Sequence, residues 1–139
     1  LAAVMELEKI TVPEIATKQL VIANVAPDIV ERALAAKYPV VHIYTQSVSN
    51  TLREKFRTFS GQAHMAVEVR ASQDRLEGLE VALQIYTDAV TRVLDANRGD
   101  WSDGVFYAGG YEVEFGAVKH GGKNFLQIAK VLFQMEVSI

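Results

Sequence analysis

The chain has 139 residues, of which 50% are apolar and 22% charged, and its formal net charge is −3. This length suits one domain, and the charge balance gives no overall signature of nucleic-acid binding. Cysteine is absent, which excludes disulfides, cysteine-ligated zinc, iron–sulfur clusters and thiol nucleophiles. Charged residues interrupt every apolar stretch, so we expect no membrane span and no membrane partner.

Two short helices are predicted near the N-terminus. Pro13 is typical of a first helical turn, and the apolar spacing that follows it predicts a helix over residues 13–25. Pro27 begins a second helix, which Pro39 ends. We interpret the first 26 residues as a helical extension of the domain that follows.

Strands are predicted in the next part of the chain. The β-branched and aromatic run 40–44 indicates a short strand. Residues 51–59 fit either a helix or a strand, and we favour a strand that forms a hairpin with the clearly alternating strand 64–71. In such a strand three cations would lie in a row on one face: Arg53, Lys55 and Arg57.

The strongest helical pattern follows. Asp74 and Glu77 resemble a capping box, and Gly99 stands where a left-handed cap ends many helices. Between them, apolar residues recur at spacings of three and four and predict one buried stripe: Leu76, Leu79, Leu83, Tyr86, Val90 and Val93.

A glycine-rich loop over 99–110 precedes two further strands. Alternation predicts a strand over 111–117, a turn over 119–124, and a long last strand over 125–137. The complete prediction is an α+β fold: a mainly antiparallel sheet of about four to five strands, packed against a long helix and shorter N-terminal helices. Residues 27–139 would form this single domain.

No motif commits the chain to catalysis. The three histidines, His42, His64 and His120, show no metal-ligand spacing, so we expect no metal, no catalytic residue and no cofactor. The glycines near Lys119 approach a phosphate-binding loop, but strands flank them on both sides, and a β-hairpin explains them better.

Two groups of residues are candidates for contacts. Aromatic residues gather in and beside the loop 99–110, and they indicate either a loop packed on its own domain or a protein contact. With the following turn they supply the candidate subunit or tube contacts: Trp101, Phe106, Tyr107, His120 and Lys123. The row Arg53, Lys55 and Arg57 is by default solvated, but in a ring around DNA it would meet phosphates without reading sequence.

The order of the last elements resembles the tail-terminator and head–tail joining (neck) proteins of long-tailed bacteriophages. The resemblance covers about residues 27–139 and is sharpest over 65–137. It rests on the strand 65–71 and on four sequences: SQDRLEGL (72–79), LDANRGD (94–100), GGYEV (109–113) and NFLQIA (124–129).

This resemblance implies a structural protein of the virion, without enzymatic activity, that assembles in the host cytoplasm. It would form a homo-oligomeric ring, which in that family is usually a hexamer. The ring caps the tail tube and joins it to the head connector. Its partners would be other copies of itself, the tail tube protein, the head-completion protein and, in the channel, genomic DNA. A head-completion (stopper) protein of the same neck is the first alternative. A small α+β ligand-binding or enzymatic dimer is the alternative from another class.

Overall fold

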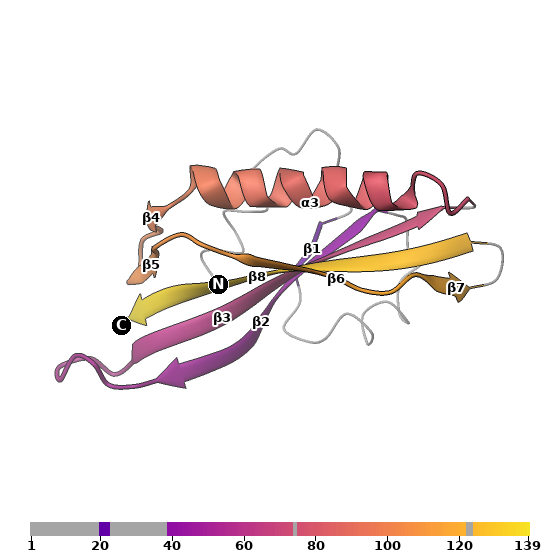
Figure 1. Cartoon of the computed structure of the whole chain (residues 1–139). Helices are drawn as coiled ribbons and strands as arrows, with labels where there is room; N and C mark the ends of the chain where they lie inside the picture. The colour runs from indigo at the N-terminus through magenta and orange to yellow at the C-terminus, as the bar shows by residue number, and fades with distance from the viewer. Residues whose placement is uncertain (1–19, 23–38, 74, 122–123) are drawn as a thin grey trace.

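The computed structural model describes residues 20–22, 39–73, 75–121 and 124–139 (Figure 1). Its elements are β1 (Leu20–Ile22), β2 (Val40–Asn50), β3 (Ser60–Gln73), α3 (Leu79–Ala96), β4 (Gly99–Asp100), β5 (Val105–Tyr107), β6 (Glu112–Phe115), β7 (Lys119–Gly121) and β8 (Asn124–Ser138). The strands form one sheet in the order β1-β2-β3-β8-β5-β4, and β6 and β7 also pair with β8. All pairs are antiparallel except β1 with β2.

The predicted fold class is wrong. The structure is mostly antiparallel sheet, and its described part contains a single helix of 18 residues instead of a long helix with several N-terminal ones. Strand β1 lies inside the helix predicted over 13–25, because pairing of Leu20–Ile22 with the edge of β2 outweighs the helical spacing. The second predicted helix, and the rest of the extension 1–26, lie outside the described residues.

Residues 51–59 form neither a strand nor a helix. They connect β2 to β3, which pair from Val40↔Arg70 to Asn50↔Gly61. The side-chain Oδ1 of Asn50 accepts hydrogen bonds from the backbone N–H groups of Leu52 and Ser60, at 3.2 and 3.1 Å. This side chain closes the connection at its base. The predicted hairpin between residues 51–59 and 64–71 is wrong, because the hairpin forms between β2 and β3.

The core lies between α3 and one face of the sheet. β3 and β8 pair from Ser60↔Ser138 to Gln73↔Phe125, and alternate residues of both strands turn the same face toward the helix. Buried side chains from the three elements fill this layer: Met65, Val67, Val69, Leu79, Leu83, Val90, Leu94, Ala129, Val131, Phe133 and Met135.

The helix begins later than predicted. Gly78 precedes it with φ 85°, and no side chain caps the first turn, so α3 starts at Leu79 and leaves Leu76 exposed. The predicted cap Asp74 lies outside the described residues. The predicted end is confirmed, since α3 stops at Ala96 and Gly99 has φ 111°.

The predicted loop over 99–110 contains the hairpin β4–β5. It lies against β8, with Val105 opposite Val137. Gly104 is required at the turn: its φ is 79°, and an added Cβ would stand 1.9 Å from the backbone oxygen of Ser138. Shortening this segment would therefore remove part of the sheet and not only a surface loop.

The sheet continues beyond the end of the helix. The β2–β3 hairpin and its connection project past α3, with β8 beside β3 for most of the way (Figure 1). Residues 45–58 are all exposed, and Phe59 is half-buried. We call residues 45–62 the arm and residues 51–59 the arm tip.

A pair of substitutions on α3 tests the assignment of its two faces. Leu83 is fully buried and Val81 is 59% exposed. We expect Leu83→Ala to lower the free energy of unfolding by about 2–5 kcal/mol because it leaves a cavity. Val81→Ala, the matched control, should change it by less than about 0.5 kcal/mol. Urea unfolding followed by circular dichroism measures both, and equal effects would contradict the packing described here.

Candidate functional site

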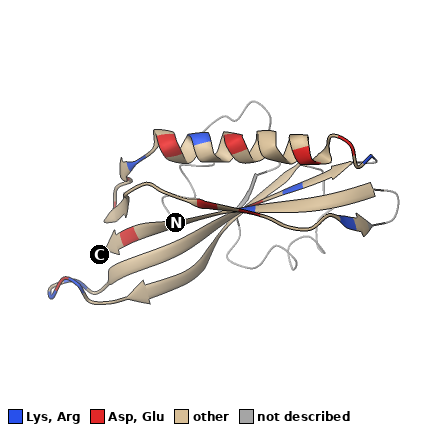
Figure 2. Ribbon diagram, viewed as in Figure 1, with Lys and Arg blue, Asp and Glu red and all other residues tan. Residues whose placement is uncertain are grey.

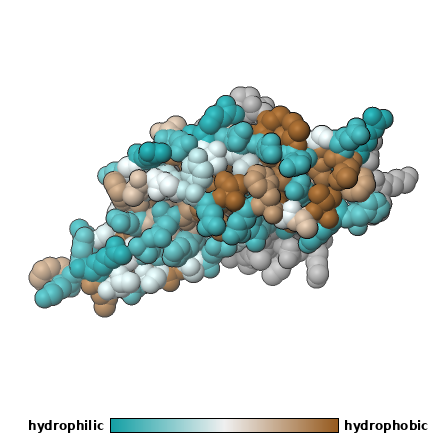
Figure 3. Space-filling view, in the orientation of Figure 1, coloured by the Kyte–Doolittle hydropathy of each residue, from teal (hydrophilic) through white to brown (hydrophobic). Residues whose placement is uncertain are grey.

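The arm tip carries the most exposed aromatic side chain in the described part of the chain. Phe56 is 100% exposed, and Leu52 nearby is 59% exposed. Figure 3 shows apolar atoms next to hydrophilic ones at the far end of the arm. An aromatic ring held in water at the end of a projecting hairpin buries no surface within its own chain, so it is available to a partner.

The three basic residues of the tip do not form the predicted row on a strand face. They lie on the connection around Phe56 (Figure 2). Arg53 faces Glu136 at 3.9 Å, and Arg57 is 3.3 Å from Glu54. The row on one strand face that was predicted for a DNA channel is therefore not formed, and both ion pairs lie at the exposed surface.

The aromatic residues of 99–110 divide between the core and the surface. Trp101 and Tyr107 are buried, and both rings pack against Phe133, with centroids at 6.3 and 5.6 Å. The Tyr107 hydroxyl donates to the backbone oxygen of Gly110 at 2.9 Å, and burial raises the pKa of this side chain. These two residues are thus core residues, and only Phe106, 44% exposed, remains available for contacts.

Phe106 and Arg53 come together at the base of the arm tip. They line a shallow depression of about 230 Å³ with residues of β3 and β8, including Glu136. Phe106 and Arg53 belong to two separate candidate groups in the sequence. Because β5 and the connection lie at the same end of β8, the fold makes them neighbours.

His120 and Lys123 stand apart from both groups. His120 is exposed on β7, with its ring 4.9 Å from that of Phe125 in an edge contact. Lys123 lies outside the described residues. Among the described residues no group of three or more possible metal ligands is found.

A buried ionic cluster lies on the sheet face opposite α3. Glu68 is 4% exposed, and its Oε1 accepts a hydrogen bond from the Tyr44 hydroxyl at 3.0 Å. Arg70 Nη2 is 3.3 Å from its Oε2, and Lys130 Nζ is 3.3 Å from its Oε1. Both carboxylate oxygens are occupied, as a buried charge requires. Burial and the neighbouring Glu68 carboxylate raise the pKa of Tyr44 to about 12.

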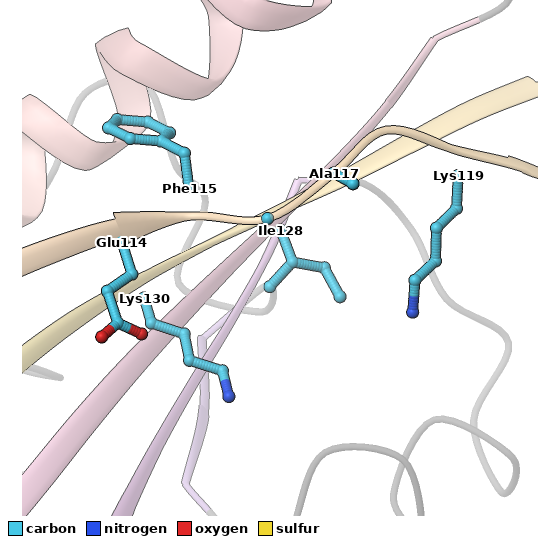
Figure 4. A pocket seen from close by; sticks show the side chains of 7 residues that line it. Glu114, Phe115, Ala117, Lys119, Ile128 and Lys130 are labelled. Atoms are coloured by element: carbon cyan, nitrogen blue, oxygen red, sulfur yellow. The ribbon is translucent and has the colours of Figure 1, made fainter.

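Lys130 extends this cluster toward a depression of about 270 Å³ beside β6 (Figure 4). Glu114 is its cross-strand partner and lines the depression with Lys119 and Ile128. Figure 4 shows Phe115 turned to the other side, toward the helix. Since Lys130 is already bound to Glu68, the depression offers one acidic and one further basic group, with no enclosed cavity between them.

Sequence reasoning missed this cluster. Glu68 and Arg70 occupy the polar positions of the alternating strand predicted over 64–71, whereas both are buried in the structure. The available signal was their spacing of two, which places opposite charges side by side on one strand face. Phe56 belongs to the segment 51–59 that was predicted as a strand, and the structure leaves its ring in solvent.

Comparison with models of known protein families finds no match, and comparison with curated proteins finds no similar one. In the part of the chain that the structure describes, no helix has the length and apolar character needed to cross a membrane. The fold and its surfaces therefore carry the functional argument.

The raised pKa of Tyr44 predicts how stability depends on pH at the alkaline end. Because the folded state holds the phenol proton more tightly, its contribution is fully present below about pH 10 and is lost as the pH rises toward about 12. Ultraviolet titration of the phenolates should show late transitions for Tyr44 and Tyr107, and Tyr44→Phe should remove the one that belongs to Tyr44. In Glu68→Gln that transition should move to lower pH. A Tyr44 that titrates with an ordinary pKa would contradict the cluster.

Proposed function

We propose that the chain is a structural subunit of the bacteriophage head–tail junction, a tail terminator that closes into a ring on the tail tube. The observation that carries this proposal is the arm: a hairpin that projects past the helix and ends in a fully exposed Phe56. The resemblance in element order over 65–137 supports the same class. A head-completion protein of the same neck is the nearest alternative.

A subunit that forms a ring must meet one geometric requirement. Each copy must present two different surfaces, one of which meets the other on the next copy, because a cyclic contact is heterologous. The arm and the body supply such a pair, since the arm tip carries basic residues around an exposed aromatic ring and α3 carries more acidic than basic residues (Figure 2). The proposed subunit acts by self-association and by docking on the tube, without chemistry.

The ligand-binding alternative rests on one observation. Glu114, Lys119 and Lys130 line the depression of Figure 4, and convergent polar groups are typical of a binding site. A protein of this kind would be a small dimer. Its oligomeric state therefore separates it from the ring.

Native mass spectrometry of the purified chain over a wide concentration range tests the proposal. We expect a hexamer, or a ladder of species that ends at six, because a closed ring satisfies every heterologous contact. Size-exclusion chromatography with light scattering gives an independent mass. A tight dimer at every concentration would contradict the ring and favour the ligand-binding alternative.

A further inference from the structure

The outer face of α3 has a composition that complements the arm tip. Val81 and Ile85 are one turn apart and are 59% and 45% exposed. Figure 3 shows hydrophobic surface over the N-terminal half of the helix. Exposed carboxylates flank this apolar pair at Glu80 and Asp88. The helix surface thus carries an apolar pair with two carboxylates beside it, and Arg92 is a cation on the same surface.

The arm tip carries cations around an apolar side chain, where the helix surface carries carboxylates. Phe56 is the apolar element, and Lys55 and Arg57 are its direct neighbours in the chain. Residues 51–59 carry three cations and one carboxylate. Lys55 forms no ion pair with any described residue. An aromatic ring between cations matches an apolar pair between carboxylates, which is the complementarity that fixes orientation at protein interfaces.

The helix surface also has room for a side chain from a partner. A shallow depression of about 410 Å³ is lined by Ile85, Asp88, Thr91 and Arg92. The tip cannot reach this site on its own chain, because it lies beyond the end of the sheet that α3 covers (Figure 1). An arm tip that contacts this surface must therefore belong to another copy of the chain.

We propose that the arm tip of one copy packs on the outer face of α3 of the next copy, with Phe56 against Val81 and Ile85. Lys55 and Arg57 then face Glu80 and Asp88. This contact joins two different surfaces, so repeating it produces a ring or a filament and not a symmetric dimer. The inference rests on the proposed function and specifies which surfaces close the ring.

Engineered cysteines test the contact directly, because the native chain has none. Phe56→Cys is mixed with Ile85→Cys, and disulfides are mapped by mass spectrometry after mild oxidation. Val118→Cys is the matched control, since Val118 is 43% exposed and Ile85 is 45% exposed. We expect the 56–85 disulfide to exceed the 56–118 disulfide at least tenfold. Equal yields would overturn the contact.

Charge reversal tests the orientation. We expect Lys55→Glu/Arg57→Glu, and separately Glu80→Lys/Asp88→Lys, to weaken assembly about tenfold or more, and the four changes together to restore most of it. All four positions are exposed, so circular dichroism should show an unchanged fold. If the four changes together weaken assembly by the combined effect of the two double variants, instead of restoring it, the proposal is wrong.

The outcomes also separate this inference from the proposed function. A native hexamer without the 56–85 disulfide would reject the contact and leave the ring intact. A wild-type chain that stays dimeric would reject both. If Lys55→Glu/Arg57→Glu abolishes binding to duplex DNA and leaves assembly unchanged, the tip is a phosphate contact, and the proposed docking on α3 is wrong.

Discussion

The antiparallel pairing of β3 with β8 is the interaction on which the remaining structure depends. It runs without interruption from Ser60↔Ser138 to Gln73↔Phe125. β2 joins this pair on one side, and β5, β6 and β7 all join β8 on the other. Because side chains alternate between faces, this one register decides which residues meet the helix and which meet the opposite side. A shift of the pairing by one residue would turn the apolar side chains of the core to the face opposite the helix and the ionic cluster toward the helix.

The same register explains why charges are buried on the second face. Glu68 lies directly opposite Lys130 on β8, and Arg70 is two residues along the same strand. Pairing with β8 brings Lys130 to the carboxylate, the spacing of two along β3 places Arg70 beside it, and Tyr44 from β2 adds a hydroxyl donor. A buried carboxylate with all of these partners removed would be strongly destabilising, so the cluster constrains β2, β3 and β8 to one alignment.

Predictions from sequence succeeded where a pattern was local and long. The alternation over 125–137 and the end of α3 near Gly99 could both be identified, since each depends on neighbours in the chain. They failed where distant segments decide the outcome. Residues 20–22 have apolar spacing compatible with a helix, but they pair with β2, and no local signal reveals that partner. The burial of Glu68 likewise depends on contacts across the sheet.

The arm tip is anchored although its aromatic ring is exposed. The Glu54 backbone N–H donates to Ser60 Oγ at 2.9 Å, and Ser138 Oγ donates to Glu54 Oε2 at 2.8 Å. These bonds hold the tip to both β3 and the end of β8, so little conformational entropy remains to be lost when a partner binds. Full burial of one phenylalanine contributes about 1.5–3 kcal/mol. In the proposed ring this contribution would recur at every interface, so even a modest gain from each Phe56 would be multiplied by the number of subunits.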